Sequence, residues 1–404
     1  MKVLFAHQNM PGQFGHLAQA LAREPGSTVL FATQRKDREL PGVGKLPYEP
    51  ARTATEGGHH YLRLIEEAVL NGQAVARVMM ALKDKGFEPD VIVGHPGWGE
   101  TLFAKDIFPR SGLVAYCEFF FQADSGLVVG ADTAPTLDQK LRTRVENAHL
   151  LLALDACDLG WSPTAWQQSR FPELYQPKID VVFDGVDTER LRPDPAARFI
   201  LPDGRILSAG DEVITYVSRG LEPQRGFPQF ARALPAVLKA RPGAQVVIAG
   251  EDKPYYGARP AADDSWRALV EREGVIDPDR VHFMGRIPYD RYIALLQVSS
   301  VHVYLTTPFV LSWSFFEAMA AGCLVVGSRS APVLELLRDG VNGLTTSFDD
   351  PRLIAEDIVR ALEHPGAADL RRAARATILE RYSLAQCLPK QVDILRRAAE
   401  SARR

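Results

Sequence analysis

The order of the apolar segments predicts an α/β protein with two parallel sheets. Short runs rich in β-branched and aromatic residues alternate with longer helical segments, which is typical of βαβ units. This alternation ends near Asp184 and starts again at Val213, after a stretch rich in Asp, Gly and Pro. The sequence therefore predicts two Rossmann-like domains, residues 1–184 and 185–382, followed by a basic helical tail, residues 383–404.

The elements of the first domain follow from these runs. We expect strands at the runs VLFA, TVLFAT, VIVG, LVAY and IDVVF, with helices at residues 61–85 and 137–154. In the second domain, VITYVS, VVIAG, VHFMG, VHVYL and CLVVG are the expected strands. The expected helices between them are residues 227–239, 266–272, 289–297 and 314–321.

Composition excludes several classes of protein. The 404 residues are 46% hydrophobic and 24% charged, which is enough for two globular domains. A net charge of −3 argues against a nucleic-acid-binding protein. The four cysteines form no CxxC pair, so we expect small core residues in a reducing compartment.

Cytoplasmic localisation is the expectation from hydropathy. No apolar run approaches the roughly 20 residues of a membrane span. The first apolar run, VLFA, is too short for the core of a signal peptide. The arginine-rich helices near the C-terminus leave peripheral contact with an anionic inner membrane surface open.

The first candidate site is the stretch from Val303 to Val326, where a strand, a turn, a helix and a second strand follow closely. The free N–H groups of such a helix N-terminus bind anions. We expect Glu317 in the first turn of this helix. It has two interpretations, a capping box with Ser314 or a ligand contact.

Two arginines form the second candidate. Arg219 and Arg225 lie six residues apart between a strand and a helix. Both could face one anion such as a diphosphate, although arginines in loops are often merely solvated. Gly250, Glu251, Gly285 and Arg286 end two further strands and by themselves indicate ordinary turns.

The first domain offers a third group of candidates. Gly12 and Gly15 lie between the first strand and the first helix, where they permit either ligand approach or a tight turn. The dinucleotide fingerprint GxGxxG is absent, which argues against an NAD-dependent enzyme. His95 follows the strand VIVG, next to Trp98, which offers a stacking face. Glu118 precedes three phenylalanines, so we expect either a raised pKa or a buried pair with an arginine.

The segment PFVLSWSFFEAMAAGCLVVGS, followed by LRDGVNGL, resembles the nucleotide-sugar segment of glycosyltransferase family 4. That family is retaining and has the GT-B fold, two Rossmann-like domains facing a central cleft. It carries two glutamates eight positions apart, and the second, which binds the donor ribose, matches Glu317. The first falls on Phe309, so its role cannot be carried over. The resemblance also implies a final helix that crosses back to the first domain.

The resemblance assigns roles to the candidates. It implies a nucleoside diphosphate sugar as donor, a glycan, lipid-linked or small-molecule acceptor in polysaccharide assembly, and no cofactor. Arg219 and Arg225 match its basic pair. The catalytic candidates are His95, Glu118, Arg219 and Arg225. The donor-binding candidates are Gly250, Glu251, Gly285, Arg286, Leu311, Ser312, Trp313 and Glu317, and the acceptor-side candidates are Gly12, Gln13, Gly15 and Trp98.

Metal binding is not expected. The D-x-D formed by Asp277 and Asp279 lies in a proline-containing turn, where aspartates favour local hydrogen bonds. Two other functions remain open. A sugar-nucleotide 2-epimerase shares the fold, and the Phe309 departure is compatible with an inactive, glycosyltransferase-like binding protein.

Overall fold

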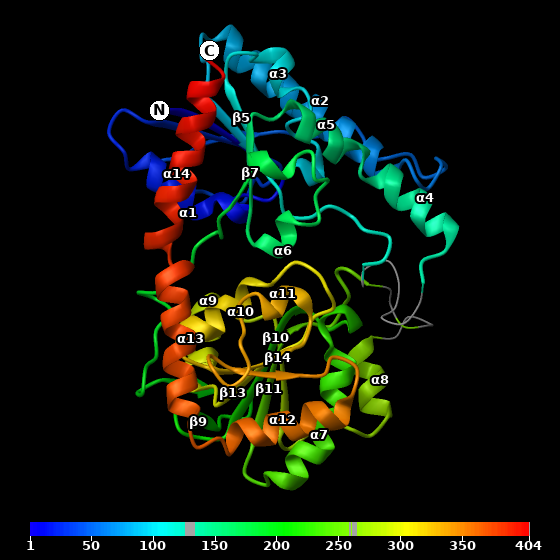
Figure 1. Ribbon diagram of the computed structural model, residues 1–404, viewed down its shortest axis with the longest axis vertical. Helices are drawn as coiled ribbons and strands as arrows, with labels where there is room; N and C mark the ends of the chain where they lie inside the picture. Colours follow the sequence, from blue (N-terminus) through cyan, green and yellow to red (C-terminus); the bar gives the residue numbers. More distant parts are fainter. Residues whose placement is uncertain (126–133, 258–259, 261–264, 404) are drawn as a thin grey trace. The chain divides into compact units, whose positions relative to one another are not determined.

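The computed structural model describes residues 1–125, 134–257, 260 and 265–403, and its contacts divide the chain into two units (Figure 1). The first unit contains Met1–Asp124, Ala134–Gly185 and the C-terminal segment from Leu384. The second contains Ser125 and Val186–Ser383. The boundaries after Gly185 and Ser383 lie one residue beyond the limits expected from the sequence, and the C-terminal helix belongs to the first unit. Ser125 belongs to the second unit, although the sequence placed residues 1–184 in one domain.

The first unit is built on a parallel sheet, with the order β3-β2-β1-β4-β5-β6-β7 among the described residues. The strands are β1 (Lys2–Ala6), β2 (Thr28–Thr33), β3 (Gly44–Pro47), β4 (Val91–Gly94), β5 (Gly112–Tyr116), β6 (Leu159–Ser162) and β7 (Ile179–Val181). The sequence missed β3 and β6. Both are four residues long, and β3 has no fully buried residue.

Helices cover both faces of this sheet. They are α1 (Gly15–Ala22), α2 (Arg63–Asp84), α3 (Ala104–Ile107), α4 (Leu137–Glu146), α5 (Ala148–Ala156), α6 (Ala165–Gln168) and α14 (Leu384–Ser401). Helix α14 packs on β4, β5 and β6 beside α1, whereas α2, α3 and α5 pack together (Figure 1). Gly112 in β5 allows this approach, because a Cβ there would lie 2.5 Å from the Ala398 backbone.

The single helix expected at residues 137–154 is instead two helices, α4 and α5. The break falls at Asn147, whose side chain accepts a 3.0 Å hydrogen bond from the Phe121 N–H. The same side chain donates a 2.9 Å bond to the Phe121 carbonyl oxygen. Because Phe121 comes from the loop after β5, this break depends on a contact that no local pattern encodes.

The second unit contains another parallel sheet, with the order β12-β11-β10-β13-β14-β15 among the described residues. Its strands are β10 (Val213–Gly220), β11 (Gln245–Glu251), β12 (Val281–Gly285), β13 (Val301–Tyr304), β14 (Leu324–Ser328) and β15 (Leu344–Thr346). A short antiparallel pair, β8 (Arg198–Ile200) and β9 (Ile206–Ser208), precedes it. The sequence predicted neither this pair nor β15.

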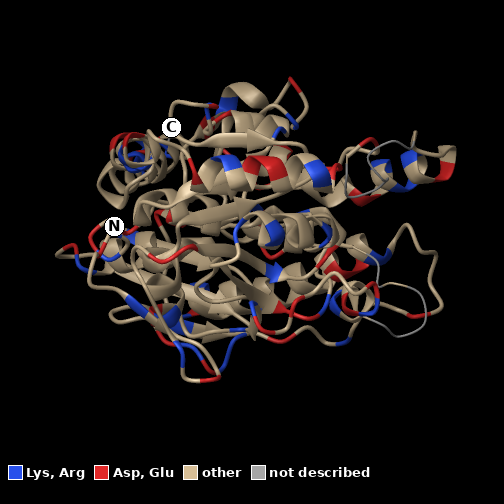
Figure 2. Cartoon of the chain, turned by 90° about the horizontal axis from the view of Figure 1, so that it is seen from below, with Lys and Arg blue, Asp and Glu red and all other residues tan. Residues whose placement is uncertain are grey.

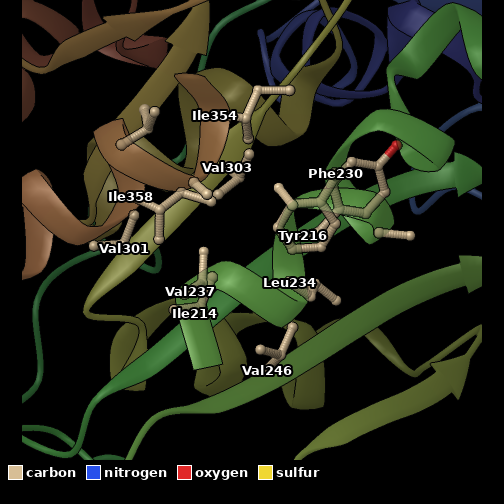
Figure 3. Close-up of a cluster of buried hydrophobic side chains, with 14 of the residues drawn as sticks. Ile214, Tyr216, Phe230, Leu234, Val237, Val246, Val301, Val303, Ile354 and Ile358 are labelled. Carbon is tan, nitrogen blue, oxygen red and sulfur yellow. The ribbon is translucent and has the colours of Figure 1, made fainter. Parts of the chain in front are cut away.

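Helices also cover both faces of the second sheet. They are α7 (Phe227–Ala240), α8 (Trp266–Arg272), α9 (Tyr289–Val298), α10 (Trp313–Ala321), α11 (Ala331–Leu334), α12 (Pro351–Leu362) and α13 (Ala367–Arg381). Helices α7, α8 and α12 pack together, and α9, α10 and α13 form a second packed group. Aliphatic and aromatic side chains of α7 and α12 meet those of β10, β11 and β13 in a buried core (Figure 3). Each large side chain buried there contributes about 1.5–3 kcal/mol.

Both sheets contain a point at which the strand order reverses. It falls between β1 and β4 in the first sheet and between β10 and β13 in the second. In open α/β sheets, ligands bind outside the carboxyl ends of strands at such points. The segments that follow these four strands are therefore where a site is expected on topology alone.

The surface carries mixed charge. Figure 2 shows basic and acidic residues interspersed along the exposed helices, in keeping with the net charge of −3. The four cysteines are free and buried, as predicted. Within the described ranges, no helix is both long enough and apolar enough to span a membrane.

Candidate functional site

Arg225 lies at the reversal point of the second sheet, just before α7. Its side chain is 6% exposed. Nη1 donates hydrogen bonds to Tyr304 Oη (3.2 Å), Thr306 Oγ1 (2.9 Å) and the Val310 carbonyl oxygen (3.0 Å). Among the described residues, all hydrogen bonds of this guanidinium leave from Nη1. These three bonds hold the guanidinium in a fixed orientation.

Two aromatic rings pack on the Arg225 guanidinium. Its central carbon lies 5.5 Å from the ring centre of Tyr256 and 5.3 Å from that of Phe309. The two rings contact each other edge to face, with centres 5.0 Å apart. Phe309 is 7% exposed. At this position the resemblance expects a glutamate, so here an apolar ring replaces a carboxylate beside the arginine.

Arg219 is exposed at the end of β10. Its guanidinium lies 3.9 Å from the ring centre of Tyr255. The sequence placed both arginines in a loop, but Arg219 belongs to the strand. The strand end and the Tyr255 ring restrict the position of Arg219, although it is not buried like Arg225.

Helix α10 begins beside Arg225. Its N-cap is Ser312, whose Oγ accepts a hydrogen bond from the Ser314 N–H. The Ser312 N–H donates a 2.8 Å bond to Tyr304 Oη, which also accepts from Arg225. The hydroxyl of Tyr304 therefore ties the helix N-terminus to the arginine. The helix ends at Gly322 in a left-handed conformation, as expected.

The capping-box interpretation of Glu317 is wrong. Glu317 is the fifth residue of α10, beyond the first turn, because the helix starts at Trp313. Its Oε1 accepts a 2.7 Å bond from the Tyr289 hydroxyl, and its Oε2 accepts a 2.7 Å bond from the Tyr292 hydroxyl. Burial raises the pKa of Glu317, and the two tyrosine bonds partly oppose this. The carboxylate is thus held by α9 and not by its own helix end.

The other donor candidates have varied surroundings. Glu251 accepts a hydrogen bond from the Tyr255 hydroxyl and pairs with Lys253 at 2.9 Å. These contacts lower its pKa, the tyrosine bond most strongly. Gly250 packs on the Ser218 carbonyl oxygen, whereas Gly285 has a φ of +58° and open space at its Cβ position.

Three more donor candidates differ in exposure. Leu311 is 5% exposed and belongs to the core. Trp313 is 47% exposed at the start of α10. Arg286 is exposed beyond β12.

In the first unit, His95 directly follows β4, as the sequence predicted. Its Nδ1 accepts a 3.1 Å bond from the Gly97 N–H. The ring proton therefore resides on Nε2, which lies 3.1 Å from Glu118 Oε2. His95 is consequently a donor to Glu118, with its ring orientation fixed from both sides.

Glu118 lies two residues beyond β5 and is paired with His95 and Gln13, not with an arginine. Gln13 Nε2 donates a 2.9 Å bond to Oε1 of Glu118. Burial works to raise the pKa of Glu118, but the bonds from His95 and Gln13 outweigh it, so the pKa is lowered. The raised pKa expected from the sequence is therefore wrong, since the adjacent phenylalanines do not decide the surroundings of this carboxylate.

His7 belongs to the same cluster, although the sequence analysis did not select it. Its ring centre lies 5.6 Å from that of His95, and its Nδ1 accepts a 2.9 Å bond from the Asn9 N–H. Burial, followed by the nearby His95, lowers the pKa of His7 to about 3. The available signal was its place directly after β1, at the reversal point. Gly12 leaves room for this ring, because a Cβ at position 12 would collide with it at 2.9 Å.

Glu100 is a second residue that the sequence analysis missed. It is 1% exposed, and its Oε1 accepts bonds from the Gln8 N–H (2.7 Å) and the Tyr48 hydroxyl (2.9 Å). Burial raises the pKa of Glu100 to about 7. No sequence pattern distinguishes it from a surface glutamate.

The remaining acceptor-side candidates are Gly15 and Trp98. Gly15 is the first residue of α1 and packs against Pro11, where a Cβ would lie 3.1 Å away. The Trp98 ring is 39% exposed, and its centre lies 5.9 Å from that of His95. The structure thus brings Gln13, His95, Trp98 and Glu118 together, and it gives Gly12 and Gly15 packing roles.

Asp277 and Asp279, the residues of the D-x-D sequence, make local contacts in their turn. Asp277 pairs with Arg280 at 2.8 Å and accepts a 3.0 Å bond from the Asp279 N–H, the local bonding that the proline turn indicated. In the part of the chain that the structure describes, no three His, Cys, Asp or Glu side chains are grouped so as to hold a metal ion.

Two parallel-sheet units of this kind define the GT-B class of fold. Solved structures agree: sucrose-phosphate synthase of Thermosynechococcus elongatus has a TM-score of 0.74 at 16% identity, over 99% of this chain and 100% of its own. HepE of Anabaena, solved with UDP and glucose, has a TM-score of 0.68 at 17% identity, over 98% of this chain and 100% of its own.

Comparison of the sequence with family models gives two matches. The family described as "Glycosyl transferase family 4 group" matches residues 25–191, and "Glycosyl transferases group 1" matches residues 211–364. Both matches are to glycosyltransferase models, and each covers about two fifths of the chain.

Two of the curated relatives come from Mycobacterium tuberculosis. A GDP-mannose-dependent alpha-(1-6)-phosphatidylinositol monomannoside mannosyltransferase is 27% identical over 252 residues, which are 60% of this chain. The match spans 62% of the length of that relative. A glycogen synthase is 26% identical over 385 residues, covering 89% of this chain and 82% of its own.

Proposed function

We propose that the protein transfers a glycosyl group from a nucleoside diphosphate sugar to a glycan, lipid-linked or small-molecule acceptor, with retention of configuration. One observation carries this proposal. Arg225 is buried at a sheet reversal point, is anchored through Nη1 alone, and adjoins the N-terminus of α10. Such a fixed cation suits a polyanionic leaving group better than it suits a role in folding.

The chemistry follows from the charge that develops on the leaving group. When the bond between the sugar and the diphosphate breaks, negative charge accumulates on the diphosphate oxygens. Arg225, Arg219 and the first N–H groups of α10 would bind that charge. Glu317, held by Tyr289 and Tyr292, would accept hydrogen bonds from the donor ribose.

The acceptor side is assigned to the first unit. Glu118, held by His95 and Gln13, offers a carboxylate that can accept a hydrogen bond from a sugar hydroxyl. The exposed face of Trp98 offers a stacking surface for a sugar ring. These features support an acceptor that contains a sugar, in polysaccharide or glycolipid assembly.

The donor base is left to experiment, because the relatives differ. The mannosyltransferase is named for GDP-mannose, whereas HepE has been solved with UDP-glucose. Thermal unfolding with UDP, GDP and ADP and their sugar derivatives tests the proposal. A ligand at 100 times its dissociation constant should add about 2.7 kcal/mol to the free energy of unfolding.

The proposal also requires that the bound donor be converted to product. With the stabilising donor, release of nucleoside diphosphate should depend on an acceptor, and the new glycosidic bond should have the donor's anomeric configuration. Failure of every nucleotide to stabilise the protein would refute the proposal. The Phe309 ring beside Arg225 favours one alternative, a binding protein without activity, which would bind the donor and release no product.

A further inference from the structure

Glu222 lies between the two arginines in sequence, and its carboxylate binds a different loop. The side chain is fully buried. Its Oε2 accepts backbone hydrogen bonds from Tyr255 (3.0 Å), Tyr256 (2.8 Å) and Gly257 (3.0 Å). Three consecutive N–H donors on one oxygen fix the path of the backbone at these residues.

The two tyrosines of this loop are the rings that contact the arginines. Tyr255 lies under the Arg219 guanidinium at 3.9 Å, and Tyr256 lies against the Arg225 guanidinium at 5.5 Å. The Tyr255 hydroxyl is also bound by Glu251, so this ring is held at both ends. Each guanidinium therefore contacts a ring whose backbone Glu222 holds.

We propose that Glu222 is the positioning residue for both arginines, acting through the Tyr255 and Tyr256 rings. The proposal rests on the proposed function, because it takes Arg219 and Arg225 as the groups that bind the diphosphate. Glu222 itself is too deeply buried to contact a ligand. Its removal should disturb the recognition of phosphate groups and leave recognition of the nucleoside intact.

This difference separates positioning from a general folding role. We would measure the dissociation constants of the full-length protein by calorimetry, for the nucleoside diphosphate that binds best and for the corresponding nucleoside. In Glu222→Ala, diphosphate affinity should fall about tenfold or more, and nucleoside affinity by less than twofold. Glu222→Gln keeps one carbonyl oxygen for the three N–H donors, so it should recover part of the loss.

A matched control is Thr215→Val, in strand β10, which ends two residues before Glu222. Thr215 is fully buried and bonded to Ser299 (2.7 Å) and His302 (2.9 Å), far in sequence from the tyrosine loop. This variant should lower stability without changing either affinity. Equal loss of diphosphate and nucleoside affinity in Glu222→Ala would overturn the positioning role.

A second measurement needs no ligand. Hydrogen exchange of the Tyr255, Tyr256 and Gly257 amides should accelerate in Glu222→Ala and stay slow in Thr215→Val. If exchange of these three amides is unchanged in Glu222→Ala, the inference is overturned. This result would count whatever the stability of the variant. If the wild-type protein binds no nucleoside diphosphate, the proposed function falls together with this inference. If the wild type binds and Glu222→Ala binds equally well, only this inference falls.

Discussion

The Tyr292 hydroxyl donates a 2.7 Å hydrogen bond to Oε2 of Glu317, and this bond joins α9 to α10. Together with the bond from Tyr289, it occupies both oxygens of the carboxylate with neutral donors. Glu317 therefore has a structural role in addition to the ribose contact that the family resemblance implies. Mutation must separate the two roles.

Glu317→Ala should weaken donor binding roughly tenfold or more and lower the free energy of unfolding by about 1–3 kcal/mol. The stability cost arises because Tyr292, 8% exposed, would keep a hydroxyl without its acceptor. Calorimetric binding and urea denaturation would measure the two effects. Tyr292→Phe is the control, since it removes one bond and keeps Glu317. An unstable Glu317→Ala with normal affinity would assign Glu317 to folding alone.

Arg219→Ala and Arg225→Ala should each lower kcat/KM about a hundredfold, because the leaving diphosphate would lose a fixed cation. Their effects on stability should differ. Arg219 is exposed, so its removal should change the free energy of unfolding by less than about 0.5 kcal/mol. Arg225 anchors Tyr304, Thr306 and Val310, so its removal should cost about 1–3 kcal/mol.

Arg267→Ala is the control for these arginines. Arg267, in α8, also stacks on an aromatic ring, that of Phe283, at 4.2 Å. It should leave kcat/KM unchanged. Normal rates in both site variants would remove the arginines from the proposed site.

His95→Ala and Glu118→Gln should reduce transfer to the acceptor while leaving nucleotide affinity near that of the wild type. The physical reason is that both residues belong to the first unit, whereas the proposed nucleotide contacts belong to the second. Steady-state kinetics with varied acceptor and calorimetry with nucleotide would measure this. Loss of nucleotide binding in either variant would contradict the division of roles between the units.

Glu100 should make stability depend on pH. Its pKa is about 7 in the folded protein, against 4.5 for the ordinary group. The folded state thus binds the proton more tightly, so the stabilisation is complete below about pH 4.5 and is lost as the pH rises through about 7. Relative to wild type, Glu100→Gln should gain stability over this window, by roughly 3 kcal/mol at most.

Urea midpoints at several pH values would check this prediction. Glu49→Gln, the same substitution at an exposed glutamate, is the control. A constant difference between Glu100→Gln and the wild type from pH 4.5 to 8 would contradict the assignment.

Transfer should proceed in excess EDTA at close to its rate in magnesium. Arg219, Arg225 and the N-terminus of α10 already supply positive charge and N–H donors to the proposed diphosphate site. A divalent cation beside two guanidinium groups would be repelled unless carboxylates accompanied it. Complete loss of activity in EDTA, restored by magnesium or manganese, would show that a metal binds the leaving group.

Local sequence patterns were sufficient to predict those strands, helices and helix ends that depend only on neighbouring residues. The strand VHVY is wholly buried, and the helix after it ends at Gly322, which adopts the left-handed conformation that glycine favours. His95 lies directly after β4, as its place behind VIVG indicated. Strand, helix and stop signals are short-range, so one sequence reveals them.

Contacts between distant segments were decided only by tertiary structure. Glu317 is held by tyrosines 25 and 28 residues away, and Glu118 by Gln13, 105 residues away. These partners reverse the expected cap of Glu317 and the expected pKa of Glu118. Sequence alone determined the two parallel sheets and the position of Arg225 between a strand and a helix, because periodicity and strand ends are local. Folding decided the partners of each charged group, because the energy of a buried charge depends on donors that the sheet order brings together.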